Sequence, residues 1–255
     1  MFGQRILILI PHPDDEVVAC AAAIGRAKKA GAKIFAFYLT SGCPASDELW
    51  PWQRPSANRR IARRRAEGER AAEKLGIMPA AWSSRPARHL WRQLSKALHE
   101  AENVIARCRI DQIWVPAYEG GNADHDGLNA IGAILSQGIS VLEFAEYNWL
   151  GGTVNSQSFP YPSRDVQTII LTEEEQRLKR QCLEIYESER RNLSYVATTQ
   201  ESFRPIARYD YSKPPHPGLL WYMRFHWTPF PHPGIDFSTS SMVCKAITCL
   251  LQDGK

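Results

Sequence analysis

The sequence lacks any apolar stretch long enough to cross a membrane, and the aliphatic run Ile6 to Ile10 has only five residues. Its N-terminus is too poor in apolar residues for a signal peptide, so we expect a cytoplasmic protein. The six cysteines form no C-x-x-C pair, which argues against a disulfide framework and a structural zinc site. A net charge of +4 over 255 residues gives no support for a nucleic-acid partner. These absences predict a globular protein with reduced thiols and leave its oligomeric state open.

What is present is an alternation of strand and helix patterns. Apolar, strand-like runs occupy residues 6–10, 33–40, 112–115, 140–147 and 166–171, and helical patterns occupy 17–30, 59–75, 88–107, a stretch ending at 135 and one starting at 172. Such spacing favours right-handed crossovers and a parallel sheet. We therefore expect a Rossmann-like α/β fold, a mostly parallel sheet with helices on both faces. It forms one domain of residues 1–255, with a core at 1–190 and an irregular C-terminal lobe at 191–255 that is rich in proline and aromatic residues.

The most informative segment is Pro-His-Pro-Asp-Asp-Glu, from Pro11 to Glu16, which follows the first strand. Open α/β sheets place their ligand sites at this edge, where strands end. Burying one imidazole and three carboxylates together is unfavourable unless something pairs with them, and a divalent cation is a suitable partner. His12 and either Asp14 or Asp15 are therefore candidate metal ligands, and the spacing alone does not separate the two aspartates.

A second polar segment, Tyr118 to Gly127, follows the strand at 112–115, so His125 can meet His12 at the same edge. Two imidazoles and one carboxylate with open positions are typical of a catalytic metal site. Zinc suits these ligands, and Fe(II) also uses two histidines and one carboxylate. An aspartate after a strand can instead cap a helix, and either histidine can belong to an ordinary turn. The pairing favours the metal, because each segment explains the burial of the other.

At this point the sequence resembles the PIG-L/LmbE-like family of zinc-dependent N-acetylglucosamine (GlcNAc) deacetylases. The first motif is specific, and softer matches extend the resemblance over roughly residues 6–189. The softer matches are Thr40-Ser41-Gly42, the Arg64-x-x-Glu67 helix ending at Leu75-Gly76, the loop from Tyr118 to Asp126, and Lys179 with Tyr186 and Ser188.

The resemblance implies that His12, Asp15 and His125 bind zinc and that Asp14 is the general base. It also implies that Arg64 contacts the substrate, and Tyr118 of the second polar segment is a further candidate for substrate binding. The family loop usually carries a histidine three residues before the metal histidine, where this chain has Asn122. A neutral amide can still donate a hydrogen bond to an oxyanion, so Asn122 remains a candidate catalytic group with a weaker donor.

We expect a zinc-dependent hydrolase that removes an N-acetyl group from an amino sugar or sugar conjugate. One alternative is a catalytically impaired member that binds carbohydrate. Another is a non-haem Fe(II) oxygenase that uses His12, Asp14 and His125, although those sites belong to antiparallel jelly rolls. Arg204 and Arg224 are further cleft candidates that the sequence does not decide between.

Overall fold

A computed structural model of the chain describes residues 2–161 and 163–253. Its centre is a seven-stranded sheet with the order β3-β2-β1-β4-β5-β9-β8. The strands β1 (Arg5–Ile10), β2 (Lys33–Tyr38), β3 (Met78–Trp82), β4 (Gln112–Pro116) and β5 (Ser140–Phe144) are parallel. The strands β9 (Gln200–Pro205) and β8 (Gln167–Ile170) extend the sheet in antiparallel pairing. The mostly parallel α/β fold expected from the sequence is confirmed.

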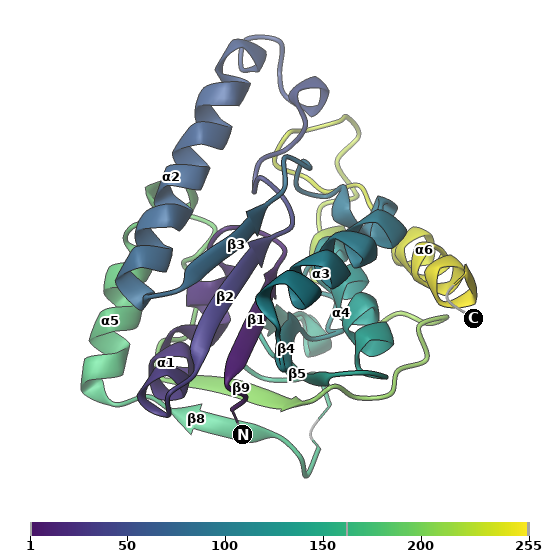
Figure 1. Cartoon of the computed structure of the whole chain (residues 1–255). Coiled ribbons are helices and arrows are strands. Elements are labelled where there is room, and N and C mark those ends of the chain that lie inside the picture. The colour runs from purple at the N-terminus through teal and green to yellow at the C-terminus, as the bar shows by residue number, and fades with distance from the viewer. Residues whose placement is uncertain (1, 162, 254–255) are drawn as a thin grey trace.

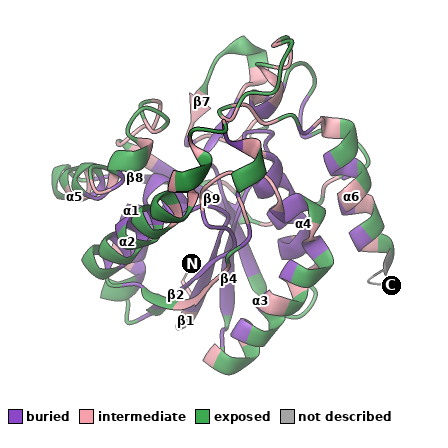
Figure 2. Ribbon diagram, turned by 90° about the horizontal axis from the view of Figure 1, so that it is seen from above, coloured by how far each residue is buried: buried purple, intermediate pink, exposed green. Residues whose placement is uncertain are grey.

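Helices cover both faces of this sheet, as Figure 1 shows. The helices α1 (Asp15–Lys29), α2 (Ala57–Leu75) and α5 (Glu173–Leu183) pack on one face, and α3 (Leu94–Cys108), α4 (Ala123–Leu135) and α6 (Ser240–Asp253) pack on the other. Side chains alternate along a strand, so Ile6, Ile8 and Ile10 of β1 join the first core and Leu7 and Leu9 join the second. All five are fully buried, and Figure 2 shows the strands of the sheet largely in the colour of buried residues. A strand buried on both faces explains the unbroken apolar run.

The remaining elements are short. A two-stranded sheet pairs β6 (Tyr147–Asn148) with β7 (Asn155–Ser156), and six 3-10 turns occur at Ser46–Glu48, Arg54–Ser56, Leu90–Arg92, Leu150–Gly152, Glu187–Glu189 and Trp221–Met223. None of the described helices combines the length and hydropathy that a bilayer crossing requires.

Capping chemistry sets two helix ends as the sequence predicts. Thr172 accepts the backbone N–H of Glu175, whose carboxylate accepts the Thr172 N–H in return, so a capping box starts α5. Gly76 ends α2 in the left-handed conformation, with φ of 68°. At α1 the alternative role of an aspartate as helix cap is not realised. Asp14 occupies the cap position, but its side chain makes no cap hydrogen bond, because the carboxylate instead accepts one from Arg64.

The structure differs from the sequence prediction mainly beyond residue 195, where we expected irregular chain. The strand β9 inserts into the sheet and α6 packs on α4. The strand β9 carries charged residues that are buried as ion pairs, Glu201 with Lys179 and Arg204 with Glu143, and such a polar segment lacks the apolar signature of a strand. The edge strand β3 was not predicted either, and the helix expected over 88–107 begins only at Leu94.

The sheet order determines where the site lies. Because β4 pairs with both β1 and β5, the carboxyl ends of these three strands are neighbours. The segments that follow them begin at Pro11, Ala117 and Ala145, and they meet at this edge of the sheet.

Candidate metal-dependent active site

Three side chains form a compact triangle of ligand atoms at the edge of the sheet. His12 Nδ1 lies 3.2 Å from His125 Nε2 and 3.4 Å from Asp15 Oδ2, and His125 Nε2 lies 3.3 Å from the same Asp15 oxygen. Bond lengths of about 2.0–2.1 Å in a tetrahedral zinc site place neighbouring ligand atoms about 3.3 Å apart. All three residues are buried. The donor set and its spacing therefore fit a divalent cation with at least one position left open.

Each imidazole has a carboxylate near the ring nitrogen that is not part of the triangle. His12 Nε2 lies 3.2 Å from Asp124 Oδ2, and Asp124 also accepts the backbone N–H groups of Arg88 and Leu90 at 2.6 and 2.9 Å. His125 Nδ1 lies 3.8 Å from Glu146 Oε2. A carboxylate that is hydrogen-bonded to the second ring nitrogen, as Asp124 is to His12, fixes the tautomer and the ring orientation of a metal-binding histidine. This arrangement supports the assignment of His12 as a ligand, and Glu146 is the acidic neighbour of His125 without a hydrogen bond to it.

The electrostatics of the cluster favour positive charge. Burial alone would lower the pKa of His12, but its hydrogen bonds to Asp124 and Asp15 outweigh burial and raise the pKa to about 10. Burial alone would raise the pKa of Asp15, but the neighbouring imidazoles of His125 and His12 bring it well below its usual range. The carboxylates thus stabilise positive charge at this position, and a divalent cation can supply that charge in place of the imidazole proton.

Asp14 is adjacent to the triangle but outside it. Its Oδ2 accepts a hydrogen bond of 2.6 Å from the Arg64 guanidinium, and both side chains are buried. Burial raises the pKa of Asp14 to about 7, and Arg64 opposes this rise. The carboxyl group is thus held in place near the ligands without being one of them.

The backbone of Asp14 is strained, with φ of 141°, a region that side-chain-bearing residues rarely adopt. Its N–H donates to Glu16 Oε2 at 3.1 Å, and the Tyr186 hydroxyl donates a short hydrogen bond to the other Glu16 oxygen. Strain of this kind costs about 1–3 kcal/mol and persists only where the surroundings enforce it. Glu16 and Tyr186 therefore stabilise the conformation that presents the Asp14 carboxylate.

Asn122 lines the same cleft and caps α4. Its Oδ1 accepts the backbone N–H of Asp124 at 2.9 Å, and its Nδ2 has no hydrogen-bond partner among the described residues. Tyr118 lies elsewhere. Its hydroxyl donates to the Lys213 carbonyl at 2.7 Å, its ring packs against two other tyrosines, and it is not among the residues that line the cleft. The structure thus brings Asn122, but not Tyr118, to the predicted site.

The cleft has a volume of about 520 Å³, and its lining includes the three residues of the triangle and Asp14. Of the residues left undecided by the sequence, Arg224 lines it, whereas Arg204 of β9 is paired with Glu143 of the neighbouring strand β5. Glu146 and Asp124 are the residues whose importance the sequence did not indicate. Glu146 is a single acid after the apolar strand β5. It reaches the cluster only because β5 pairs with β4 in the sheet.

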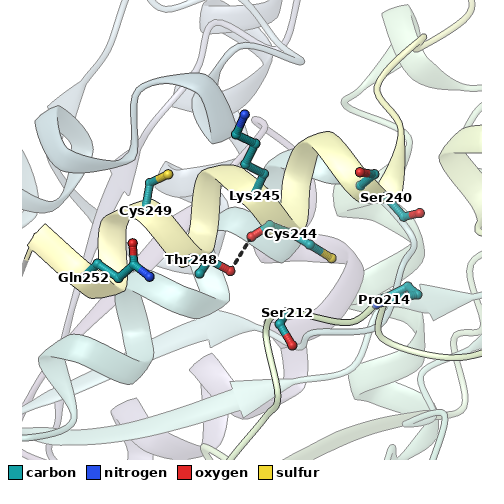
Figure 3. Close-up of a pocket in the computed structure, with 9 residues that line it drawn as sticks. Ser212, Pro214, Ser240, Cys244, Lys245, Thr248, Cys249 and Gln252 are labelled. Carbon is teal, nitrogen blue, oxygen red and sulfur yellow. Dashed lines mark hydrogen bonds between the residues drawn. The ribbon is translucent and has the colours of Figure 1, made fainter.

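A second hollow, of about 560 Å³, lies against α6 and is drawn in Figure 3. Small polar and thiol side chains line it, among them Ser212, Cys244 and Thr248, whose hydroxyl donates to the Cys244 carbonyl. It holds none of the predicted site residues and no cluster of ligating groups. Despite its size, it is a weaker functional candidate than the cleft.

The fold and the cluster together define an α/β protein with a two-histidine, one-aspartate site in a cleft. The sequence model of the PIG-L family, described as GlcNAc-PI de-N-acetylase, matches residues 7–135, and the chain belongs to this family. The matched part runs from β1 through α4 and includes both loops that supply the triangle. The resemblance seen in the sequence is confirmed, and with it the expected class of enzyme, an N-deacetylase. A search of the curated proteins finds no match.

Solved structures show the same fold at low identity. The A40926 pseudoaglycone deacetylase Dbv21 is 20% identical, with a TM-score of 0.59 over 81% of this chain and 98% of that one. The zinc-inhibited form of teicoplanin deacetylase Orf2 is 16% identical, with a TM-score of 0.59 over 81% and 99%. The 4-carboxy-2-hydroxymuconate hydratase GalB from Pseudomonas putida KT2440 is 15% identical, with a TM-score of 0.50 over 81% and 98%. A hydratase among them means that the chemistry must be argued from the site, because one fold hosts different reactions.

Proposed function

We propose that the chain is a divalent-metal-dependent N-deacetylase that removes an acyl group, in the first place acetyl, from the amine of an amino sugar or sugar conjugate. The observation that carries this proposal is the triangle of His12 Nδ1, Asp15 Oδ2 and His125 Nε2, with edges of 3.2 to 3.4 Å. The family model, described as GlcNAc-PI de-N-acetylase, and the similar structures described as A40926 pseudoaglycone deacetylase and teicoplanin deacetylase support a sugar conjugate as the kind of substrate.

His12, Asp15 and His125 would hold the cation, and Asp124 and Glu146 would orient the two imidazoles. A divalent cation bound there would supply a lowered pKa for its water and polarisation of the amide carbonyl. The three ligands come from two rigid strand ends, so their spacing is fixed before any substrate enters.

Asp14 acts as the general base in this proposal. Its Oδ2 is occupied by Arg64, and its Oδ1 has no hydrogen-bond partner among the described residues and is left for the attacking water. Asp14 accepts the water proton and returns it to the leaving amine, a role in which a pKa near neutrality is favourable. Arg64 is thus placed as the partner of the base. The contact with substrate that the family resemblance implied for Arg64 stays a prediction, for which its position in the cleft leaves room.

Asn122 is the proposed oxyanion donor. Because its Oδ1 accepts the Asp124 N–H, the orientation of the amide is fixed and the NH₂ group remains available. A single donor to a tetrahedral oxyanion contributes about 2.7–4 kcal/mol to transition-state stabilisation. The structure offers no support for Tyr118 in this role or as a substrate contact, since its hydroxyl is engaged by Lys213.

The identity of the metal is part of the proposal, with zinc first and Fe(II) second. One similar structure is described as a zinc-inhibited form, so the amount of zinc matters in the test. Metal-free protein would be given N-acetylglucosamine and chromogenic N-acetyl sugars with one equivalent or an excess of Zn²⁺, Fe²⁺, Co²⁺ or Mn²⁺, and free amine would be measured. We expect release with one equivalent of metal and none after chelation. Release that is unchanged by chelation would contradict the proposal.

The same experiment distinguishes the carbohydrate-binding alternative. A binding protein would bind N-acetyl sugars by calorimetry but release no amine with any metal. The oxygenase alternative has lost its structural support, because the parallel sheet is unlike the antiparallel jelly roll that such sites use.

A further inference from the structure

Arg88 has a strained backbone close to the metal site. Its φ is 69°, in the left-handed region that favours glycine. In this conformation three backbone N–H groups donate to the Asp124 carboxylate at 2.6, 2.9 and 3.2 Å, those of Arg88, Leu90 and Trp91. Backbone N–H groups that converge in this way form a concave anion-binding nest. The Asp124 oxygen that accepts the Arg88 N–H also lies 3.2 Å from His12 Nε2, so the nest, residues 88–91, holds the carboxylate that orients this ring.

The side chain of Arg88 explains why the strained position is not a glycine. It is half-buried, it lines the cleft, and its Nη1 donates to the Ile235 carbonyl at 2.9 Å. A residue in a sparsely populated backbone conformation persists only where its surroundings enforce it. A glycine would adopt the same backbone without strain but would lose this contact. The contact joins the nest to a part of the chain that is 147 residues away in the sequence.

The acceptor of this hydrogen bond belongs to residues 232–238, a segment that we call the strap and that partly lines the cleft. The strap is held by further hydrogen bonds. The Ser238 N–H donates to Asp236 Oδ1 at 2.8 Å, and His226 Nε2 lies 2.8 Å from the Asp236 carbonyl oxygen. The Ile235 carbonyl is therefore a fixed point of attachment for Arg88. It lies outside residues 7–135, the part of the chain that the family model matches.

Charge also connects Arg88 with the strap. Asp236 is a neighbour of both Arg88 and Asp124, and its Oδ2 is buried without a hydrogen-bond partner among the described residues. Burial raises the pKa of Asp236, and hydrogen bonding by Ser238 and the charge of Arg88 oppose this rise. The Asp124 carboxylate adds to it. Without the Arg88 charge, the two carboxylates would only repel each other. Arg88 therefore stabilises the strap in its place beside the nest.

We infer that Arg88 is a positioning residue, which ties the strap to the nest and thereby keeps Asp124 in the orientation that fixes the His12 ring. The inference rests on the proposed metal-dependent function and gives the C-terminal segment a role in it, although that segment supplies no ligand to the triangle. Loss of the partner of a metal-binding histidine lowers metal affinity about 10- to 100-fold. Arg88 acts one step further out, and His89, whose Nε2 lies 3.0 Å from Glu48 Oε1, attaches the nest a second time. We therefore expect an effect at the lower end, of about tenfold.

The test removes the side chain of Arg88 and keeps its backbone. In Arg88→Gly the left-handed conformation stays accessible, so the nest can still form. In the metal-free protein, NMR of the imidazole nitrogens of His12 reports its tautomer and its hydrogen bond to Asp124, and we expect these resonances to shift. The affinity for Zn²⁺, measured by competition with a chelator, should fall about tenfold. Arg88→Lys should restore part of both, because an ammonium group can still donate to the Ile235 carbonyl.

Arg109→Gly is the matched control. Arg109 is also left-handed, with φ of 50°, but it is exposed at the end of α3 and outside the cleft. The same change should leave both measurements as they are. Asp236→Asn tests the strap from its own side, since asparagine keeps the acceptor for the Ser238 N–H and loses the charge. It should lower the affinity less than Arg88→Gly does, and it should no longer lower it in the double variant, where Arg88 is absent.

Unchanged His12 resonances together with unchanged affinity in Arg88→Gly would overturn the inference, and so would an equal change in Arg109→Gly. A higher KM for an N-acetyl sugar with metal affinity intact would also overturn it, because Arg88 would then be a substrate contact. A shift of the His12 resonances in Arg88→Gly, in a protein that binds no metal or releases no amine, would instead count against the proposed function alone.

Discussion

The two walls of the cleft are built in opposite ways. On the wall formed by the loops after β1 and β4, His12, Asp14, Asp15, Asp124 and His125 are at most 8% exposed and are joined by hydrogen bonds and ion pairs. The wall formed by the chain after α5 is more open, with Arg191 and Phe225 exposed and Trp221 and Arg224 half-buried. The first wall fixes distances to tenths of an ångström, as metal chemistry requires. The second offers charge and flat apolar surface, which suits recognition of a varied sugar conjugate.

The strongest test of the first wall is removal of a ligand. His12→Ala or His125→Ala should abolish stoichiometric metal binding and lower amine release by at least about 10³-fold, because several kcal/mol of transition-state stabilisation depend on the cation. Metal content of the purified variants and amine release measure the two effects. His99→Ala is the control, since His99 is an exposed histidine of α3. A His12→Ala or His125→Ala variant that keeps both its metal and its activity would contradict the assignment of the first wall as the metal site.

Replacing the general base separates chemistry from metal binding. Asp14→Asn should lower kcat by about 10²- to 10⁴-fold while one equivalent of metal remains bound. The variant also loses the charged pair with Arg64, so thermal unfolding is recorded to distinguish inactivity from unfolding. Asp47→Asn, at an exposed carboxylate outside the cleft, serves as control. Loss of the metal together with activity would show that Asp14 belongs to the ligand set.

Glu146 sharpens the comparison, because it follows β5 and lies behind the buried wall, beside His125, without belonging to the triangle. Both of its carboxylate oxygens are buried without a hydrogen-bond partner among the described residues, and it is fully buried. Glu146→Gln should lower metal affinity about 10- to 100-fold through weaker orientation of His125. Competition with a chelator measures this directly, with the exposed Glu102→Gln as control. Unchanged affinity would make Glu146 a structural residue.

The contrast between the walls also explains what the sequence could reveal. His12 and His125 each follow an apolar strand, and the carboxyl ends of parallel strands lie at one edge of the sheet. The proximity of the two histidines was therefore predictable from the sequence pattern and the topology. The partner of Asp14 was not, because Arg64 lies fifty residues away on a helix whose many arginines look like a solvated face. Glu146 was missed because only the pairing of β4 with β5 brings it to the cluster.

The second wall was almost invisible in the sequence. Its chain has no strong periodicity, and the strand β9 is held by buried ion pairs that resemble surface charge in a sequence. Local patterns report burial of apolar faces, whereas this wall depends on long-range polar contacts.

The smallest expected effect is that of Asn122→His. Asn122 caps α4 and also lines the cleft. Asn122→His restores a donor that can carry charge, so amine release should be preserved or raised by up to about tenfold. Thermal stability should fall by about 1 kcal/mol because histidine is a poorer cap than asparagine. Asn122→Ser is the matched comparison. Serine keeps the cap but is too short to donate into the cleft, so turnover should fall about 10²-fold with stability retained. If histidine reduces turnover to background while serine does not, the amide acts through its cap and the oxyanion donor must be sought on the other wall.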